Sequence, residues 1–324
     1  MITSIERIVE EYHEKKIDID TLYNHVLSII EVCDDDQIRR KYIFSLNKIL
    51  PLLPKIKRSS LLEYLEQLLL SEINPAIKIT TISVLQSWTK NKLLNPLKWM
   101  LQHETNYDCL VSIIKSLACL ESTISKKILL KELKKIRKKV FMDEKKQIKN
   151  IKYRQELKKL FENKTIYALT PEKLADILIN YHTIKILKEK FFSVYYELEK
   201  GCVIELDLSD VEYEVRGWKP EFKNNIKSLL EIPGLENLKY LRRLDLSNNQ
   251  IQSIKELLPL KNLTHLYLGN NQLQDKENIK WINKMENLRY LEIIGNKIAD
   301  KKYIHEFNPN MEILIKRTNI PTFS

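Results

Sequence analysis

Apolar residues in the first 120 positions recur at steps of three and four residues, which is the spacing of one face of an α-helix. This pattern breaks at residues 34–36, 74–75 and 106–108. Each break supplies an Asp or Asn that can cap the start of a helix, and a stripe of Ile, Leu or Val follows it. The pattern therefore predicts a series of similar amphipathic helices.

Leu46, Leu85 and Leu117 occupy corresponding places in these helices, at steps of 39 and 32 residues. One helix pair per repeat of this length, led by an Asp or Asn, resembles HEAT-type repeats. The resemblance implies an α-helical solenoid over residues 1–165, because one helix pair cannot bury its own apolar stripe and neighbouring pairs must share a core. An irregular helical bundle would produce the same pattern.

A different period begins after Val203. Four segments align on a shared leucine at steps of 38, 22 and 25 residues: Leu206, Leu244, Leu266 and Leu291. The form L-x-x-L-x-L-x-x-N-x-I/L resembles leucine-rich repeats. Residues 238–298 look like the short 22-residue type, the subfamily that includes a regulatory subunit of protein phosphatase 1. The resemblance implies an α/β solenoid with a small parallel sheet over residues 201–324.

An asparagine returns once in each complete unit, at Asn249, Asn271 and Asn296. No catalytic motif surrounds these residues, so we assign them a structural role that is repeated in each unit. After each strand the chain must turn inward, and a buried Asn can pair there with backbone groups that would otherwise lack partners. We therefore predict a buried asparagine ladder that stabilises the repeats.

The residues on either side of the aligned leucines point away from the core and onto the concave face of the sheet. This concave face comprises Glu205, Asp207, Arg243, Asp245, His265, Tyr267, Tyr290 and Glu292. Tyr and Arg commonly anchor protein interfaces, and acidic neighbours favour a basic partner. Taken singly, each of these positions is also typical of ordinary solvated strand residues. As a set, they predict a surface that binds a protein partner.

Other parts of the C-terminal half depart from a simple repeat. Residues 166–200 are expected to form a linking helix, which begins at Pro171, ends at Gly201 and is buried on two sides. The segment 210–237, with Trp218 and Pro220, lengthens the first step, and we expect a loop that packs on the face or edge of the sheet. A terminal strand is expected to close the core through three apolar residues: Met311, Ile313 and Ile315.

Charge is concentrated in one segment, residues 126–164, which holds 16 Lys or Arg against 5 Asp or Glu. That balance equals the whole net charge of +11. The candidate polyanion-binding residues lie on helical faces: Lys131, Lys135, Lys138, Lys145, Lys149, Lys152 and Lys159. HEAT-like arrays with basic faces include a class of DNA glycosylases, which this segment resembles in helix pairing and charge. Nucleic-acid binding is therefore the second functional hypothesis.

Two other interpretations of the basic segment stay open. Its lysines can form the solvated side of amphipathic helices, and only Arg137 and Arg154 are of the type that base-reading or bidentate phosphate sites favour. Alternatively, the basic helices can pair with the acidic concave face, within one molecule or between two.

Composition argues against several classes of enzyme. All five glycines lie in the last 124 residues, so the first 200 contain no phosphate-binding glycine loop. The cysteines form no C-x-x-C pair, and the six histidines lack metal-ligand spacing. No signal peptide or apolar span is evident. We expect a cytoplasmic, non-catalytic adaptor or scaffold without a metal, small-molecule cofactor or membrane partner.

Overall fold

The computed structural model describes residues 5–89, 92–120, 122–139, 150–215 and 221–315. The chain divides into two compact units, which are described separately. The helical unit comprises Met1–Leu130 and Thr170–Ala175, and the repeat unit comprises Lys131–Leu169 and Asp176–Ser324. Contacts within the chain thus group most of the basic segment 126–164 with the leucine-containing repeats. The sequence analysis instead placed this segment with the helical repeats, and set the domain boundaries after residues 165 and 200.

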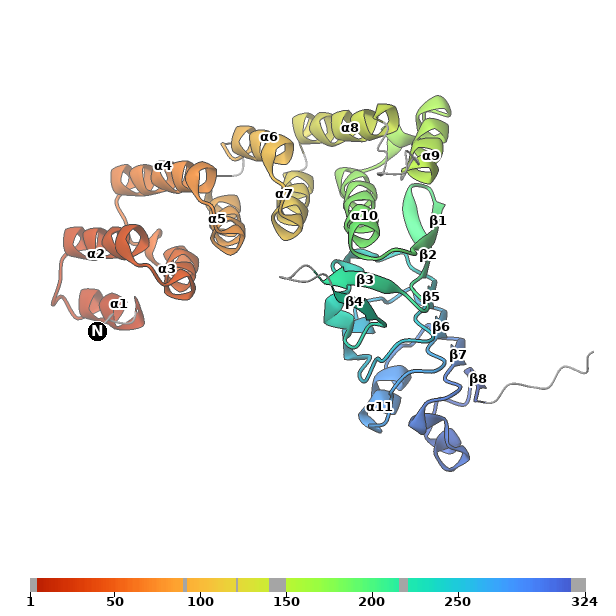
Figure 1. Cartoon of the computed structure of the whole chain (residues 1–324). Helices are drawn as coiled ribbons and strands as arrows, with labels where there is room; N and C mark the ends of the chain where they lie inside the picture. Colours follow the sequence, from red (N-terminus) through yellow and green to blue (C-terminus); the bar gives the residue numbers. More distant parts are fainter. Residues whose placement is uncertain (1–4, 90–91, 121, 140–149, 216–220, 316–324) are drawn as a thin grey trace, which may run out of the picture. The chain divides into compact units, whose positions relative to one another are not determined.

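The helical unit consists of paired helices in two layers, with α2, α4 and α6 in one layer and α3, α5 and α7 in the other (Figure 1). Within the second layer α3 packs on α5, and α5 packs on α7. The helices are α1 Ile5–His13, α2 Ile19–Val32, α3 Asp36–Ile49, α4 Lys55–Ser71, α5 Pro75–Trp88, α6 Leu94–His103, α7 Tyr107–Cys119 and the beginning of α8 Thr123–Lys138.

The breaks in the apolar pattern are helix starts, as predicted. The side chains of Asp35, Asn74 and Asn106 accept hydrogen bonds from backbone N–H groups in the first turns of α3, α5 and α7. The three aligned leucines, Leu46, Leu85 and Leu117, are fully buried. Equivalent positions in successive helices therefore have the same environment.

A glutamate at the end of α4 and another at the end of α6 add a second repeated contact. Glu72 and Glu104 each accept hydrogen bonds from the two backbone N–H groups that follow them. Each also binds a cation from the preceding second-layer helix: Glu72 lies 2.8 Å from Arg39, and Glu104 lies 2.8 Å from Lys78. Since both glutamates contribute the same set of contacts, they join neighbouring helix pairs in the same way.

Acid is expected to weaken the helical unit through Glu104. Burial raises the pKa of this carboxyl, but the bonds from Lys78 and the backbone outweigh burial and hold the pKa below the ordinary value of 4.5. Ionised Glu104 therefore stabilises the fold fully at pH values above the pKa of this carboxyl in the unfolded chain. The stabilisation is lost as the pH falls through the lower pKa of the same carboxyl in the folded protein. Urea unfolding from about pH 7 to about pH 3 should show this loss.

Glu104→Gln should lower stability at neutral pH and flatten the pH dependence, because the amide cannot ionise. The exposed Glu63 on α4 provides a matched control, since Glu63→Gln should leave the pH dependence almost unchanged. If Glu104→Gln and the original protein lose stability equally on acidification, the ion pair between Glu104 and Lys78 does not contribute to the pH dependence of stability.

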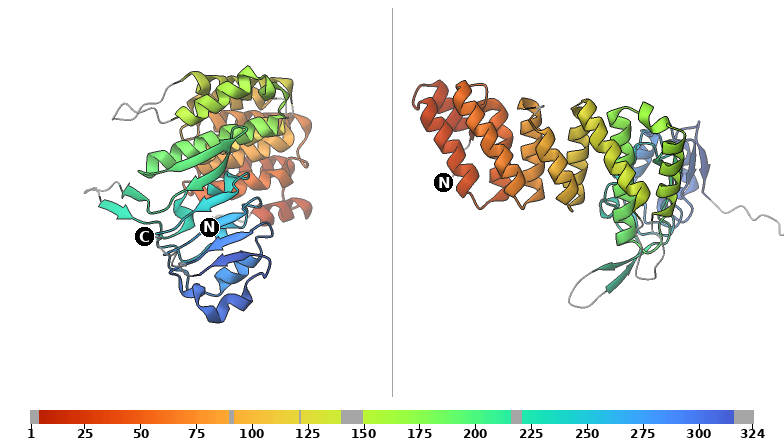
Figure 2. Two further views of the ribbon diagram at one scale, coloured as in Figure 1. Left: turned by 90° about the vertical axis from the view of Figure 1, so that its right-hand side faces the viewer. Right: turned by 90° about the horizontal axis from the view of Figure 1, so that it is seen from above.

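The repeat unit contains a six-stranded sheet in the order β1-β2-β5-β6-β7-β8 (Figures 1 and 2). The first pair, β1 and β2, is antiparallel, and every later pair is parallel. The strands are β1 Tyr195–Glu199, β2 Cys202–Asp207, β5 Arg243–Asp245, β6 His265–Tyr267, β7 Tyr290–Glu292 and β8 Glu312–Leu314. The expected terminal strand is confirmed as β8, which extends the sheet beside β7.

Short helices connect the strands on the side of the core opposite the sheet. They are the 3-10 helices η2 Leu229–Glu231, η3 Leu235–Asn237, η4 Lys255–Leu257, η5 Lys297–Ala299 and η6 Lys301–Glu306, together with α11 Glu277–Asn283. The same unit holds the later part of α8, α9 Ile151–Glu162, η1 Thr165–Ala168 and most of α10 Pro171–Lys190. The aligned leucines of β2, β5, β6 and β7 are buried in the resulting core.

The asparagine ladder is confirmed. The side-chain amide of Asn271 donates to Leu246 O at 2.9 Å and to Leu268 O at 3.0 Å, and its oxygen accepts from Ile251 N at 2.9 Å. Asn249 and Asn296 make the equivalent bonds one unit before and one unit after. Each asparagine thus joins the backbone of its own turn to that of its neighbours.

The predicted linking helix is wrong beyond Lys190. Residues 195–199 form β1, and Gly201 lies in the tight turn between β1 and β2 instead of ending a helix. Lys200 and Gly201 have φ values of 50° and 81°, the consecutive positive angles of a hairpin turn that matches the twist of the strands. Most of α10 is buried, as expected, and Asn180 on it accepts a hydrogen bond from Val203 N at 2.9 Å.

The long step between the first two units is explained by a hairpin that leaves the sheet and returns to it. β3 Glu212–Val215 pairs with β4 Glu221–Asn224 in a separate two-stranded sheet, and Asn225 N donates to Val211 O at 3.0 Å where the hairpin closes. The expected loop is therefore partly a hairpin, and Trp218 and Pro220 lie outside the described residues. Because Leu206 still pairs in register with Leu244, the insertion does not interrupt the sheet.

Candidate protein-binding face

Strand register gathers the eight predicted side chains of the concave face into two rows. The first row is Glu205, Arg243, His265 and Tyr290, and the second is Asp207, Asp245, Tyr267 and Glu292. All eight are exposed or half-buried, whereas the leucines between the rows are buried. The parallel register thus brings together residues that are far apart in the sequence.

Aromatic rings and one cation form the centre of this face. The Tyr267 and Tyr290 ring centroids lie 5.2 Å apart, and the His265 ring stacks on Tyr290 at 5.9 Å. The guanidinium of Arg243 lies 4.5 Å from the centroid of Tyr267. These contacts hold the rings in place before any partner arrives, which reduces the entropy lost on binding.

Carboxylates flank the aromatic centre. Asp207 and Asp245 each accept a hydrogen bond from the backbone N–H two residues later, at 2.8 Å and 2.9 Å, which orients both carboxylates. A Cβ atom at Gly269 would lie 2.7 Å from Oε1 of Glu292, so glycine leaves room for this carboxylate. Burial, followed by the charge of Glu292, raises the pKa of Tyr290 above its ordinary value, and its hydroxyl therefore remains a donor at neutral pH.

Two strands add residues to this face that the sequence analysis missed. Tyr195 and Glu197 on β1 lie opposite Asp207 and Glu205, and therefore continue both rows. Glu312 continues the first row at the far end, opposite Tyr290. The alternation in YYELE before Lys200-Gly201 was a hairpin signal, but the dense apolar residues before it were interpreted as one continuous helix.

One of the predicted polyanion-binding lysines instead contacts the end of this face. Lys152 Nζ on α9 lies 2.6 Å from Glu197 Oε1, 2.8 Å from Tyr196 O and 4.1 Å from the Tyr195 ring centroid. The Tyr195 hydroxyl also donates to Glu197. A basic helix thus pairs with the acidic face at this point within the repeat unit, as one of the open interpretations expected.

The remaining candidate lysines do not converge on a single point. Lys131, Lys135 and Lys138 are exposed on α8, where Lys135 pairs with Glu132, and Lys159 is exposed on α9. Lys145 and Lys149 lie outside the described residues.

The described part of α8 is amphipathic, because Leu129, Leu133 and Ile136 are buried whereas Lys131, Lys135 and Lys138 are exposed. The two arginines serve the helix pair: Arg137 lies over the Phe161 ring at 4.8 Å, and Arg154 donates to the carbonyl of Arg137 at 3.2 Å. The side chains best suited to bidentate phosphate contacts therefore have structural roles.

Comparison with known families identifies residues 241–281 by a model described as "Leucine Rich repeats (2 copies)". The search of curated proteins gave no significant match. Among the residues that the structure describes, no helix is both long and apolar enough to cross a membrane. The matched segment contains β5, β6 and the first part of α11, and its two strands pair in parallel register and share the asparagine ladder. The C-terminal part of the chain therefore contains leucine-rich repeats.

Proposed function

We propose that this protein is a non-catalytic adaptor or scaffold that binds a protein partner through the concave face. The observation that supports this function is the cluster of exposed Arg243 and His265 with half-buried Tyr267 and Tyr290, which is held in place by ring contacts and flanked by carboxylates. Solenoid repeats commonly present such surfaces to proteins. Tyr and Arg at the centre of a surface are typical interface anchors.

The partner that this face favours is basic. Beside Arg243 and His265, the described face carries six carboxylates: Glu197, Glu205, Asp207, Asp245, Glu292 and Glu312. The contact made by Lys152 supports this preference, because it shows an ammonium group held by a tyrosine ring and a carboxylate at one end of the face. Tyr290 and Glu292 supply the same pair of groups nearer the other end. Opposite charge would also accelerate association at low salt.

Further parts of the proposal concern the two repeat types. We infer that the helix pairs are HEAT-like, which the repeated contacts of Glu72 and Glu104 support. We also infer that the leucine-rich units belong to the short type similar to the phosphatase-1 regulator, on the evidence of the 22-residue step from Leu244 to Leu266. A cytoplasmic location is part of the same proposal.

Replacing both Tyr267 and Tyr290 by alanine should weaken partner binding at least tenfold, because buried aromatic anchors each contribute about 2 kcal/mol or more. Quantitative affinity capture with the full chain measures the loss. Tyr303→Ala is the matched control, since Tyr303 lies in η6 away from the concave face. Circular dichroism and thermal melting should show that both variants fold. Partner capture unchanged by the double substitution would place the binding surface elsewhere.

Nucleic-acid binding by the basic helices is the second candidate function, supported by the exposed Lys131 and Lys138 on α8. Binding to a fluorescent duplex should then fall steeply with salt, since phosphate contacts release counterions. It should also fall when both lysines are replaced by glutamate. If the charge-reversal variant bound the duplex with unchanged affinity, these helices would not be the nucleic-acid-binding site.

A further inference from the structure

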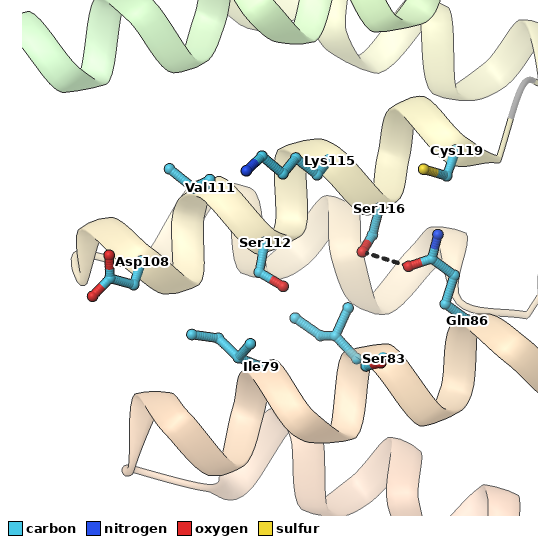
Figure 3. A pocket seen from close by; sticks show the side chains of 10 residues that line it. Ile79, Ser83, Gln86, Asp108, Val111, Ser112, Lys115, Ser116 and Cys119 are labelled. Carbon is cyan, nitrogen blue, oxygen red and sulfur yellow. Dashed lines mark hydrogen bonds between the residues drawn. The ribbon is translucent and has the colours of Figure 1, made fainter. Parts of the chain in front are cut away.

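A groove lies between α5 and α7 in the helical unit (Figure 3). Its volume is about 320 Å³, which provides room for an apolar side chain. Ile79, Ile82 and Val111 contribute apolar surface, and small Ser side chains keep the groove open. Its other lining residues are Ser83, Gln86, Asp108, Ser112, Lys115, Ser116 and Cys119.

The two helices are joined at one end of the groove by a hydrogen bond from Ser116 Oγ to Gln86 Oε1 at 3.0 Å (Figure 3). Ser83 and Cys119 are exposed at its rim, while Ile82 and Val111 are buried at its base. This arrangement leaves an apolar floor with a polar rim, which is typical of a surface that accepts side chains from another protein.

Exposed charge on α3, α5 and α7 is mostly basic, although Asp108 also lines the groove. Beyond the first turn of α3, α5 and α7, every exposed charged side chain is basic: Arg40, Lys41, Lys48 and Lys115. The exposed acids of these helices, Asp36 and Asp108, lie in first turns, where they favour the helix dipole. An acidic partner is therefore complementary to this layer of helices.

An exposed aromatic residue lies on the neighbouring helix. Phe44 on α3 is 62% exposed, and it stands two residues before Leu46, as Ser83 stands two residues before Leu85. Because these leucines are equivalent in the repeat and α3 packs on α5, Phe44 and Ser83 occupy corresponding places on adjacent helices. The apolar surface of the groove thus has a second anchor point nearby.

We propose that the exposed face of α3, α5 and α7 binds an amphipathic helix of a partner protein, with apolar side chains in the groove and Asp or Glu beside them. A third helix fits the space between two packed helices, and its acids would lie near Lys48 and Lys115. The apolar floor formed by Ile82 and Val111 favours a protein over a nucleic-acid phosphate chain. This site goes beyond the concave face and gives the adaptor a second surface with the opposite charge preference.

Cys119 provides a direct assay because it lines the groove and is exposed. In the full chain with Cys33→Ser, Cys119 is the exposed thiol among the described residues. Synthetic peptides of about 16 residues, each with one terminal cysteine, are long enough to form a helix on binding. Each terminal cysteine is supplied as a mixed disulfide with cysteamine, so that attack by the Cys119 thiolate forms the protein–peptide disulfide and releases cysteamine. The peptides are equilibrated with the protein across a series of reductant concentrations, and intact-mass spectrometry measures the fraction joined to Cys119.

Three peptides separate shape from charge. The first has Leu at helical three- and four-residue steps with Glu between, the second has Lys in place of Glu, and the third has the composition of the first in scrambled order. The Leu/Glu peptide should stay attached at a roughly tenfold higher reductant concentration than either control. Ser83→Trp, which fills the groove, and Phe44→Ala should each remove most of this preference. Ile56→Ala, at an 82% exposed site on α4, should leave it intact.

Equal retention of the three peptides would overturn the proposal, as would a preference that survives Ser83→Trp. Lys48→Glu tests the charge without altering the groove, and it should shift the preference away from the Leu/Glu peptide. A fluorescent DNA duplex that binds through Lys41 and Lys48, combined with no peptide preference, would assign this face to nucleic acid instead. The tyrosine variants of the concave face should not alter peptide retention, so each proposal can fail alone.

Discussion

Replacement of Asn271 by leucine is expected to destabilise the repeat unit by on the order of 3 kcal/mol or more. Its side chain is 7% exposed and pairs with Leu246 O, Leu268 O and Ile251 N. Leucine has a similar volume but cannot replace these bonds. Each buried backbone group that loses its partner costs roughly 1–3 kcal/mol, so the loss should exceed that of a typical surface substitution.

Urea unfolding monitored by circular dichroism measures the loss, and hydrogen exchange locates it in the repeat unit. Asn287 is the matched control, because it is exposed and its amide makes one bond to Lys261 O at 2.8 Å. Asn287→Leu should cost about 1 kcal/mol or less. The ladder would have no special role in stability if the two substitutions had equal effects.

Truncation of Leu266 to alanine is expected to cost about 2–5 kcal/mol, through lost transfer free energy and the cavity that remains. Leu266 is fully buried, and its neighbours in register are Leu244 on β5 and Leu291 on β7. Since the same residue stands at the centre of each strand, the surroundings cannot easily collapse around a smaller side chain. Thermal and urea unfolding both measure the effect.

Leu230 provides the comparison within the same unit. Its side chain is 79% exposed on η2, so Leu230→Ala should change the unfolding free energy by only about 0.5 kcal/mol. A similar cost at both sites would mean that the core of the repeats is packed too loosely to distinguish them. Leu266→Ala should also disturb the concave face, because His265 and Tyr267 flank Leu266 on β6.

Local spacing correctly predicted the regular parts of the fold. The caps at Asp35, Asn74 and Asn106 and the buried leucines of α3, α5 and α7 depend on residues within one or two helical turns. The asparagine ladder was equally predictable, because the repeat places the same polar group at the same bend in each unit. The parallel register of β2, β5, β6 and β7 then brought the eight side chains of the concave face together as expected.

Prediction failed where contacts distant in sequence decide the structure. Residues 191–199 are dense in apolar and aromatic side chains, and periodicity alone does not separate a buried strand from a buried helix. Pairing of Tyr196 with Leu206 makes this segment a strand and adds Tyr195 and Glu197 to the candidate site.

The basic segment shows the same limit for function. Its charge was counted correctly, but Lys152 meets Glu197, 45 residues later, and Arg137 covers the ring of Phe161. A count of charges does not reveal which cations are already bound within the fold. The groove between α5 and α7 was likewise absent from the sequence pattern, since its serines lie on two helices that are adjacent only in space.

The sequence by itself determined the helices, their caps, the leucine-rich units and the buried asparagines, because each depends on short-range spacing and on a repeated polar requirement. Tertiary structure alone decided that Lys200 and Gly201 turn a hairpin, that α9 places Lys152 against Glu197, and that α5 and α7 leave a groove between them. The physical reason is that side-chain periodicity is set by neighbours along the chain, whereas pairing partners and surface shape are set by packing between distant segments.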